Sequence, residues 1–349
     1  MELLSLSGVS RQSIKQLISN DYLDFSRRYT LDSNTFTFLL ENGTHVSLLA
    51  NGILGINLAS VDKHAKSIVL SCGIHGNETA PIEICSQLVT QILNQSLLSK
   101  HRILFIFGNI DAMNKGVRFI DENLNRLFVR TNAPVLLNTY EKVRADTIKH
   151  IVDSFFNGPQ SEKIHYDLHT AIRPSKHEKF AVYPFLHGRE YDLEQLAFLS
   201  ACDVNTILLS QSPTGTFSYY SSFYHHAHSF TVELGKVKPF GENDMRNFSA
   251  VKKQLIALLS KEQVLLKHYN DCPITVFKVN QVINREHENF SLGFSENIAN
   301  FTEFDKGDVL AIENGTPINA THNGEAIVFP NAEVAIGQRA LLTVIPCEL

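Results

Sequence analysis

Three pairs of residues in this sequence have the spacing H-x-x-E, which can direct an imidazole and a carboxylate at one divalent metal ion from a single turn. They are His75–Glu78, His187–Glu190 and His322–Glu325. Because the spacing recurs three times, the spacing alone identifies none of them as a site. Only the first pair lies between an apolar run, 67–72, and a helical pattern that begins near Thr79. Ligands collect at such an edge of an α/β sheet, and we expect the other two pairs to be solvated loop residues.

A catalytic zinc ion needs a third protein ligand, because such sites hold three side chains and one water. In HYDLH, residues 165–169, His165, Asp167 and His169 alternate and would share one face of a strand. That face either points to solvent or lines a site, since burying unpaired polar groups is costly. We select His169, at the strand end, as the ligand and Asp167 as its hydrogen-bond partner. A half-exposed strand is the alternative interpretation.

A second group of candidate metal ligands is clustered further along the chain. It consists of His225, His226 and His228. Its Tyr- and Ser-rich surroundings predict a loop, and we therefore favour the first set of ligands.

Glu233 is the carboxylate that could handle protons. It lies among apolar residues in a strand predicted at 229–234. Such a carboxylate either faces outward, which its position alone favours, or is held in a site where it takes a proton. Metal-assisted hydrolysis needs a group that accepts a proton from water and passes it to the leaving nitrogen.

Cationic and amide side chains lie near each of these segments. They are Arg118, Asn125, Arg126, Arg173 and Lys236. Surface exposure is the usual interpretation of any single arginine or lysine. Together, however, they are what a substrate with several negative charges would require.

The elements that would position these residues follow a strand, helix, strand order over 67–107. This order predicts a parallel or mixed sheet with its loops gathered at one edge. Further strands are predicted at 165–169, 180–183, 205–209 and 229–234, and a helix near 249–268. After residue 270 the apolar runs become short and are separated by turn signals, which predicts a β-rich domain. We therefore expect a catalytic domain at 1–270 and a β-rich C-terminal domain at 271–349.

Composition excludes several classes of protein. The 31 Lys and Arg against 36 Asp and Glu give a net charge of −5 over 349 residues, without the basic runs of a general nucleic-acid binder. No run approaches the roughly 18 apolar residues that span a bilayer, and Glu2 lies where a signal peptide would be positive. The five cysteines form no C-x-x-C pair. We therefore expect a cytoplasmic protein, without membrane partners, in a reducing compartment.

Taken in order, the segments SCGIHGNETAPIE, NLNR, DLHTAIR and TVELGK resemble the aspartoacylase and succinylglutamate desuccinylase branch of the zinc carboxypeptidase superfamily. The resemblance runs from about residue 50 to the carboxyl terminus and includes PFGEND, FDKGDVLA and VFPN. It implies an α/β fold, with a zinc-carboxypeptidase-like mixed sheet flanked by helices and a smaller C-terminal β-rich domain.

The resemblance also implies roles for the residues of the first site. His75, Glu78 and His169 would bind one zinc ion per chain. Glu233 would act first as general base and then as general acid. Arg118 would steady the carbonyl oxygen of the scissile bond.

The resemblance further implies a binding site for a substrate carboxylate. Asn125 and Arg126 would hold that carboxylate, and the charge pattern adds Arg173 and Lys236 as substrate-binding candidates. One departure is Asn123, where relatives commonly have Asp. It leaves the orientation of Arg126 open.

The implied reaction is hydrolysis of N-succinyl-L-glutamate, a small anionic substrate, to succinate and L-glutamate, the last step of arginine catabolism by the succinyltransferase pathway. One alternative is an aspartoacylase or another N-acyl-amino-acid amidohydrolase, which would share the zinc chemistry and differ in the carboxylate pocket. A further alternative is a non-catalytic metal- or metabolite-binding protein on the same scaffold. Glu233 argues against it, because binding zinc does not require a proton acceptor. The sequence does not give the oligomeric state.

Overall fold

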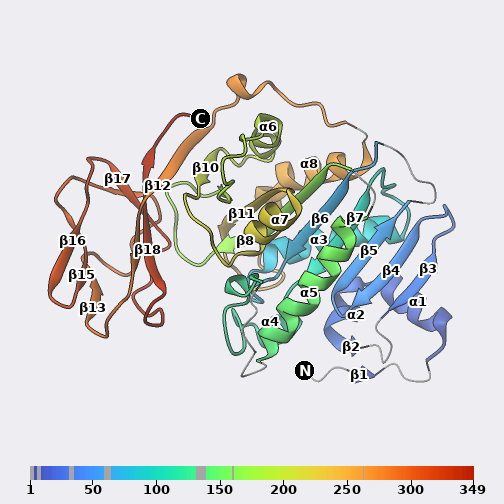
Figure 1. The fold of residues 1–349 in the computed structure, drawn as a ribbon. Coiled ribbons are helices and arrows are strands. Elements are labelled where there is room, and N and C mark those ends of the chain that lie inside the picture. The colour runs from blue at the N-terminus through green and yellow to red at the C-terminus, as the bar shows by residue number, and fades with distance from the viewer. Residues whose placement is uncertain are drawn as a thin grey trace.

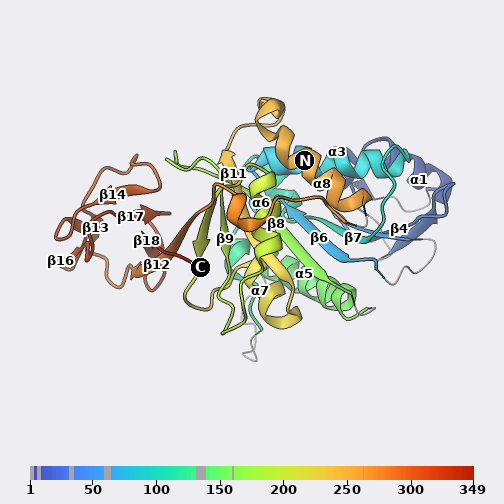
Figure 2. The ribbon, with the colours of Figure 1, turned by 90° about the horizontal axis from the view of Figure 1, so that it is seen from above.

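A computed structural model describes residues 4–5, 9–30, 35–58, 64–130, 139–158, 161–261 and 263–349. A long sheet runs through the molecule with helices on both of its faces, and the C-terminal strands lie at one end (Figure 1). Seen from above, α3, α6 and α8 lie on one side of the sheet and α5 and α7 on the other (Figure 2). The predicted α/β fold with a β-rich C-terminal domain is confirmed.

The described strands and helices have the following bounds. The strands are β1 (Leu4–Ser5), β2 (Tyr29–Thr30), β3 (Phe36–Leu39), β4 (His45–Ala50), β5 (Ile53–Asn57), β6 (Ser67–Cys72), β7 (Arg102–Phe107), β8 (Lys163–Ala171), β9 (Phe180–Tyr183), β10 (Thr206–Leu209), β11 (His228–Lys236), β12 (Thr275–Asn284), β13 (Phe290–Leu292), β14 (Thr302–Phe304), β15 (Val309–Glu313), β16 (Thr316–Asn319), β17 (Glu325–Val328) and β18 (Arg339–Pro346). The α-helices are α1 (Arg11–Asn20), α2 (Tyr22–Arg28), α3 (Thr79–Leu93), α4 (Ile110–Lys115), α5 (Tyr140–Phe156), α6 (Leu193–Ala201), α7 (Phe217–His225) and α8 (Ser249–Ser260). Three 3₁₀ turns are η1 (Leu124–Arg126), η2 (Met245–Phe248) and η3 (Tyr269–Asp271).

Within the described ranges, thirteen strands form one mixed sheet in the order β14-β17-β18-β12-β10-β9-β11-β8-β6-β7-β5-β4-β3. Its centre is parallel, since β8 pairs in parallel with both β6 and β11. The C-terminal strands extend this same sheet, because β12 pairs with β10 on one side and with β18 on the other. A separate three-stranded sheet, β13-β15-β16, completes the C-terminal domain. The continuity of the large sheet was not part of the sequence prediction.

Successive side chains of the central strands point to opposite faces of the sheet, so each face has its own core. On β8, Ile164, Tyr166 and Leu168 belong to the core packed beneath α3, α6 and α8. The residues between them therefore face the side covered by α5 and α7. His165 and Asp167 are among these intervening residues and are fully buried. The polar face of this strand lines the protein interior rather than solvent.

The predicted helix near 249–268 is correct at its beginning but too long. Helix α8 ends at Ser260, because the segment that precedes β7 takes up its last carbonyl groups. Lys100 N donates to Leu259 O at 2.8 Å, and His101 Nε2 lies 2.8 Å from Lys261 O. Tertiary hydrogen bonds thus stop a helix whose apolar pattern continues.

The predicted loop around His225 is also wrong, because α7 occupies Phe217–His225. Thr216 caps this helix, and its hydroxyl accepts from Tyr219 N at 3.4 Å. Phe217 and Tyr220 are buried in the core on this side of the sheet. Burial of the aromatic side chains stabilises a helix that composition alone does not indicate. In the described part of the chain, no helix is both long and apolar enough to cross a membrane.

Candidate active site

The first H-x-x-E pair occupies the turn between β6 and α3, where the sequence places it. Glu78 is the residue that precedes the first turn of α3, and its backbone N donates to His75 O at 3.2 Å. Gly76, inside the turn, packs so tightly that an added Cβ would lie 2.3 Å from the backbone of Ala112 and Met113. A glycine is required there because any side chain would push the turn away from α4.

His169 and Glu233 come from two neighbouring strands. In the parallel pairing of β8 with β11, Glu233 lies opposite His169 and Thr231 lies opposite Asp167. Both His169 and Glu233 are more than nine-tenths buried. Residues paired in this way point to the same face of the sheet. The register therefore brings the predicted third ligand next to the predicted proton acceptor.

The three predicted ligands converge on the carboxylate of Glu78. One oxygen lies 2.8 Å from Nδ1 of His75, and the other lies 2.8 Å from Nδ1 of His169. One ligand atom from each of the three lies within 4.8 Å of the other two. Arg118 Nη1 donates to Glu78 Oε1 at 2.7 Å, and Thr170 N donates to Oε2 at 3.1 Å. Two imidazoles and one carboxylate are the donor set of a common type of catalytic zinc site.

The electrostatics of this cluster keep the Glu78 carboxylate ionised. Burial opposes the charged form of Glu78, but the facing imidazoles of His75 and His169 outweigh it and hold the pKa of Glu78 well below its usual range. Burial, together with the positive charge of Arg118, lowers the pKa of His75 to about 4. Burial also opposes protonation of His169, but Asp167 and Glu78 raise its pKa well above the usual value. A buried ionised carboxylate among these groups is a natural ligand for a metal ion.

A chain of buried polar groups orients His169 through Nε2, the ring nitrogen that does not face Glu78. Asp167 Oδ2 lies 2.9 Å from Nε2 of His169, and its other oxygen accepts from Ser71 Oγ at 2.5 Å. Ser71 lies 2.8 Å from Nε2 of His165, whose Nδ1 lies 2.8 Å from Ser221 Oγ. Asp167 thus has the partner role that the sequence predicts. The two serines were missed, although Ser71 lies opposite Asp167 in the β6–β8 pairing.

Asn123 contacts a predicted ligand directly. Its Oδ1 lies 3.0 Å from Nε2 of His75 and accepts from Asn125 N at 3.0 Å. The asparagine therefore links the orientation of His75 to the η1 turn that carries Arg126. A side-chain oxygen at this position is sufficient for both contacts.

Glu233 differs from the other carboxylates of the site because one of its oxygens is free. Its Oε2 is buried and has no hydrogen-bond partner among the described residues. Burial and the negative charge of Glu78 raise the pKa of Glu233 to about 7. A carboxylate held in this way can exchange a proton near neutral pH.

Comparisons with known proteins show the family to which the chain belongs. A family model described as the succinylglutamate desuccinylase/aspartoacylase catalytic domain matches residues 64–259, and an AstE/AspA barrel-sandwich hybrid domain matches residues 272–347. The chain belongs to the succinylglutamate desuccinylase/aspartoacylase family. It is 54% identical to the succinylglutamate desuccinylase of Pseudoalteromonas atlantica over 91% of this chain and 92% of that protein. The corresponding protein of Idiomarina loihiensis is 45% identical over 94% of this chain and 96% of its own length.

Solved structures of this family also match the fold. The succinylglutamate desuccinylase of Vibrio cholerae superposes with a TM-score of 0.84 at 35% identity, covering 93% of this chain and 94% of that one. The protein of the same name from Vibrio parahaemolyticus gives a TM-score of 0.83 at 34% identity, covering 94% and 95% of the two chains.

In this family member, the predicted substrate-binding residues lie on η1 and at or just beyond the ends of β8 and β11. Asn125 is buried, and its Oδ1 accepts from Phe217 N at 2.9 Å at the start of α7. Arg126 Nη1 donates to the neighbouring carbonyl of Asn125 at 2.9 Å. Arg173 is half-buried just beyond β8, and Lys236 is exposed at the end of β11. The structure thus brings His75, Glu78, His169 and Arg118 into direct contact, while Arg173 and Lys236 lie at the ends of the two central strands.

The competing histidines have other roles. His187 and Glu190 are exposed, as expected. His225 is buried, with Nε2 2.7 Å from Asp153 Oδ1. The expectation of solvated loop residues is wrong for Glu325, which is fully buried at the start of β17. In the described residues, the one group of three or more His, Cys, Asp or Glu whose ligand atoms converge is the site at Glu78.

Proposed function

We propose that this family member is a zinc-dependent amidohydrolase that converts N-succinyl-L-glutamate and water to succinate and L-glutamate. Relatives that share 45–54% of their residues with nearly the whole chain carry the name succinylglutamate desuccinylase. The donor set of two imidazoles and one carboxylate fits the metal that such chemistry uses. One zinc ion per chain would be held by His75, Glu78 and His169.

When bound, zinc would supply Lewis acidity to the amide carbonyl and lower the pKa of a water molecule. The residues of this chain account for the other requirements. Glu78 and the two imidazoles present buried donor atoms within 4.8 Å of one another. Asp167 and Asn123 fix the outer nitrogens of the two imidazoles at 2.9 and 3.0 Å. Such outer contacts orient ligands and raise their affinity for metal.

The environment of Glu233 is the observation that supports the proposal most strongly. Glu233 lies opposite His169 in the strand pairing, and its Oε2 is buried and unpaired. A protein that only binds metal needs no proton acceptor at this position. In hydrolysis, Glu233 accepts a proton from the attacking water and donates it to the amide nitrogen as the carbon–nitrogen bond breaks. The two half-steps leave Glu233 in its starting state, with succinate and glutamate as products.

The cationic residues would bind and polarise the substrate. Arg118 is about one-third exposed while its guanidinium contacts Glu78, so it can reach both the metal ligands and the scissile carbonyl oxygen. Asn125 and Arg126 would hold one substrate carboxylate, with Arg173 and Lys236 as further contacts near the ends of β8 and β11. A site built for several carboxylates would discriminate strongly against substrates that lack one.

A substrate panel tests the proposal. We expect purified protein to hydrolyse N-succinyl-L-glutamate, to lose this activity with a chelator and to regain it with Zn²⁺. We expect kcat/KM for N-acetyl-L-glutamate to be at least about a hundredfold lower, because a cation that should pair with the succinyl carboxylate is then left unpaired. Equal or better use of N-acetyl-L-aspartate would instead establish the aspartoacylase alternative. If the protein hydrolyses none of these compounds, the alternative of a non-catalytic metal- or metabolite-binding protein would take the place of the proposal.

Three further parts of the proposal extend beyond the site. The catalytic domain would comprise residues 1–270 and the β-rich domain residues 271–349. Limited proteolysis near residue 271 followed by mass spectrometry tests this division. The reaction would take place in the cytoplasm as the last step of arginine catabolism through succinylated intermediates. Accumulation of N-succinyl-L-glutamate in cells that lack the protein, fed arginine, would support that place in metabolism.

A further inference from the structure

Glu141 is a fully buried carboxylate that takes no part in the steps of the proposed reaction. It lies in the first turn of α5 and has no exposed surface. Its Oε1 accepts from Ile120 N at 2.7 Å and from Asn109 Nδ2 at 2.9 Å. Its Oε2 accepts from Asp121 N at 3.1 Å and from Glu122 N at 3.4 Å. Successive backbone N–H groups that converge in this way form an anion-binding site, and the anion here is a side chain of the protein itself.

The loop bound by Glu141 has active-site contacts on both sides. Before it, Arg118 Nη1 donates to Glu78 Oε1 at 2.7 Å. After it, Asn123 Oδ1 lies 3.0 Å from Nε2 of His75. The three residues bound by Glu141 are thus the middle of a short segment whose two ends reach the candidate metal ligands. Fixing that middle fixes the direction from which Arg118 approaches Glu78.

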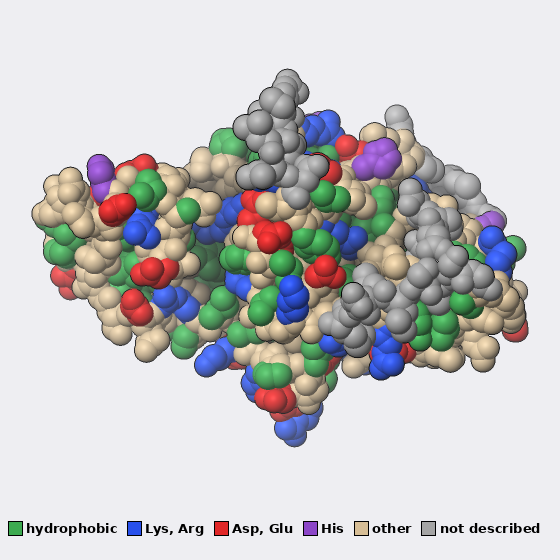
Figure 3. Space-filling view, turned by 90° about the horizontal axis from the view of Figure 1, so that it is seen from below, with side chains coloured by type: hydrophobic (Ala, Val, Ile, Leu, Met, Phe, Trp, Pro, Cys, Tyr) green, Lys and Arg blue, Asp and Glu red, His purple; other side chains and the backbone are tan. Residues whose placement is uncertain are grey.

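Contacts on the surface restrain this loop less. The Glu122 carboxylate accepts from the Thr139 hydroxyl and lies 3.3 Å from Lys142 Nζ. The side chains of Glu122 and Lys142 are each about one-third exposed, and exposed ion pairs contribute little to stability. Figure 3 shows Asp and Glu side chains mixed with Lys and Arg side chains on the face seen from below. Because hydrogen bonds to a buried charge are stronger than exposed ones, Glu141 is the main restraint among the described contacts of the loop.

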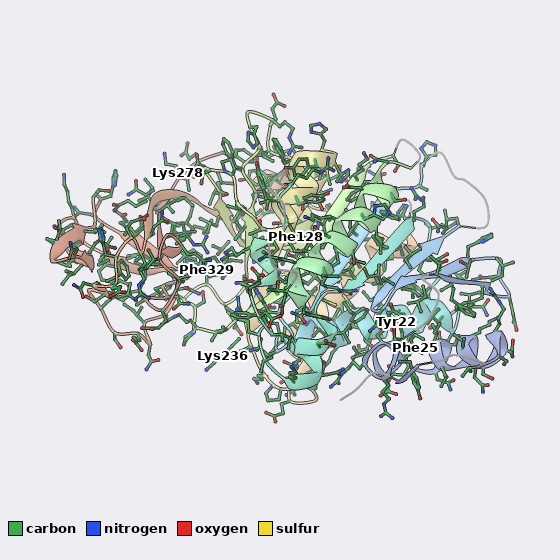
Figure 4. All side chains as sticks on the ribbon, turned by 60° about the horizontal axis from the view of Figure 1, so that its bottom comes forward. Tyr22, Phe25, Phe128, Lys236, Lys278 and Phe329 are labelled. Atoms are coloured by element: carbon green, nitrogen blue, oxygen red, sulfur yellow. The ribbon has the colours of Figure 1, made fainter. Side chains whose placement is uncertain are left out.

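Apolar packing fixes the next turn, η1, without help from Glu141. Leu124 and Phe128 are fully buried in the core that this side of the sheet shares with α5. The ring of Phe128 stacks on Phe217 with centroids 4.2 Å apart, and Figure 4 shows Phe128 in the middle of the molecule. The candidate carboxylate-binding residues of η1 should therefore keep their positions when Glu141 is changed. The segment before η1, which carries Arg118, loses its buried anchor.

We propose that Glu141 is a positioning residue that holds Arg118 within reach of the scissile carbonyl oxygen. It acts through the backbone, because it binds the N–H groups of residues 120–122 and is itself shielded from substrate by burial. The role of Arg118 at that oxygen rests on the proposed function. Both oxygens of Glu141 must be acceptors, since each faces a backbone N–H donor. An amide at this position would bring a second donor against one of those N–H groups.

A double-mutant cycle tests this role, with whichever compound of the substrate panel the wild type hydrolyses. We expect Glu141→Gln to lower kcat about 10- to 100-fold, because a small displacement of a polarising group costs this much. KM should change less than about threefold, since η1 stays in place. Arg118→Gln should lower kcat at least about tenfold less in Glu141→Gln than in the wild type, because part of its contribution is then already lost. Losses that multiply in the double variant, or a loss in KM rather than in kcat, would overturn the proposal.

Two further variants separate a displaced loop from other effects. Glu141→Asp keeps the charge and both acceptor oxygens on a shorter side chain and should recover part of kcat. It also replaces Glu141→Gln in the cycle if that variant does not fold. Asp146→Asn is the matched control, because Asp146 is a carboxylate of the same helix whose side chain is 63% exposed. It should leave kcat and KM within about twofold of the wild type.

Hydrogen–deuterium exchange separates this inference from the proposed function, because it requires no turnover. In Glu141→Gln, we expect the amides of residues 118–123 to exchange at least about tenfold faster than in the wild type. Amides of β6 and β8 should exchange at the wild-type rate, which distinguishes a released loop from a damaged fold. Equal exchange in the loop would exclude Glu141 as its anchor. If the wild type hydrolyses none of the panel while the loop of the variant exchanges faster, the proposed function fails and Glu141 still positions Arg118 against Glu78.

Discussion

The pairs His75–Glu78 and His322–Glu325 have the same spacing, but their carboxylates have different hydrogen-bond partners. Glu78 lies between two imidazoles, with a nitrogen of each at 2.8 Å. Glu325 accepts from Thr321 N at 2.6 Å, from His322 N at 3.2 Å and from Gln281 Nε2 at 2.7 Å. Both carboxylates are buried. One presents its oxygens to titratable ligands, and the other is held by backbone and amide donors.

The difference arises outside the motif. Glu78 becomes part of a candidate metal site because Nδ1 of His169, 91 residues away, lies 2.8 Å from its carboxylate at the end of β8. Among the described residues, no second imidazole reaches Glu325 in this way, and the side chain of His322 is 53% exposed. A local spacing can place two side chains on one turn. Whether a third candidate ligand lies close to them depends on how distant strands pack. The predictions below test this contrast on both motifs.

The largest effect is expected from His169→Ala. Removing the ligand that distinguishes the first motif should abolish zinc binding and lower kcat by at least about three orders of magnitude. Metal analysis and steady-state kinetics measure both quantities. His187→Ala, in an exposed loop, is the matched control and should keep full zinc content. Retention of metal and activity by His169→Ala would mean that the first motif is no more a metal site than the third.

Glu233→Gln should have the next largest effect. The amide keeps the size of the side chain but cannot accept and return a proton, so kcat should fall about 100- to 10,000-fold. Zinc content and thermal stability should stay close to those of the wild type, because Glu233 has no hydrogen bond to any of the predicted metal ligands among the described residues. Near-normal turnover would show that the unpaired oxygen of Glu233 has no part in the reaction.

Much of the first motif could be predicted from the sequence because its signals are local. The apolar run of β6, the turn with Gly76 and the start of α3 lie within a few residues of one another. The alternation of β8 likewise predicted that His165, Asp167 and His169 share a face. What the sequence could not provide was the register that sets Glu233 opposite His169, since strand pairing depends on contacts between distant segments.

The incorrect predictions have the same cause. The apolar pattern beyond Ser260 predicts more helix, but hydrogen bonds from the segment before β7 end α8 there. The composition around His225 predicts a loop, but packing against the sheet stabilises α7. Burial of Glu325 depends on the side chain of Gln281, 44 residues away. In each case the deciding partner is remote in sequence.

Glu325→Gln should affect stability rather than catalysis. Burial opposes the charged form, but hydrogen bonds from Thr343, Gln281, Asn280 and Thr321 outweigh it and lower the pKa of Glu325 from 4.5 to about 2. A carboxylate whose folded-state pKa is depressed stabilises the protein above its unfolded pKa, and this stabilisation is lost as the pH falls toward the folded value. We expect the variant to lose about 1–3 kcal/mol of unfolding free energy at pH 7.

Denaturant unfolding from pH 7 down to pH 3 measures this effect. The gap between wild type and Glu325→Gln should narrow as the pH falls below 4.5, because the wild-type carboxylate becomes protonated on unfolding. Zinc content and kcat per folded molecule should be unchanged. A constant gap across this range, or loss of zinc, would contradict the structural role of the Glu325 carboxylate.

The smallest effect is expected from His322→Ala, which removes the imidazole of the third motif. Its Nδ1 lies 2.9 Å from Thr321 Oγ1 but 3.9 Å from Glu325 Oε2, and the hydrogen bond to Glu325 comes from the backbone N of residue 322, which alanine keeps. Loss of an exposed side chain with such contacts should change the unfolding free energy by less than about 0.5 kcal/mol. Zinc content and kcat/KM should match the wild type within error, in direct contrast to His169→Ala. Loss of zinc from His322→Ala would show that the imidazole of the third motif does bind metal, and the distinction between the first and third motifs would fail.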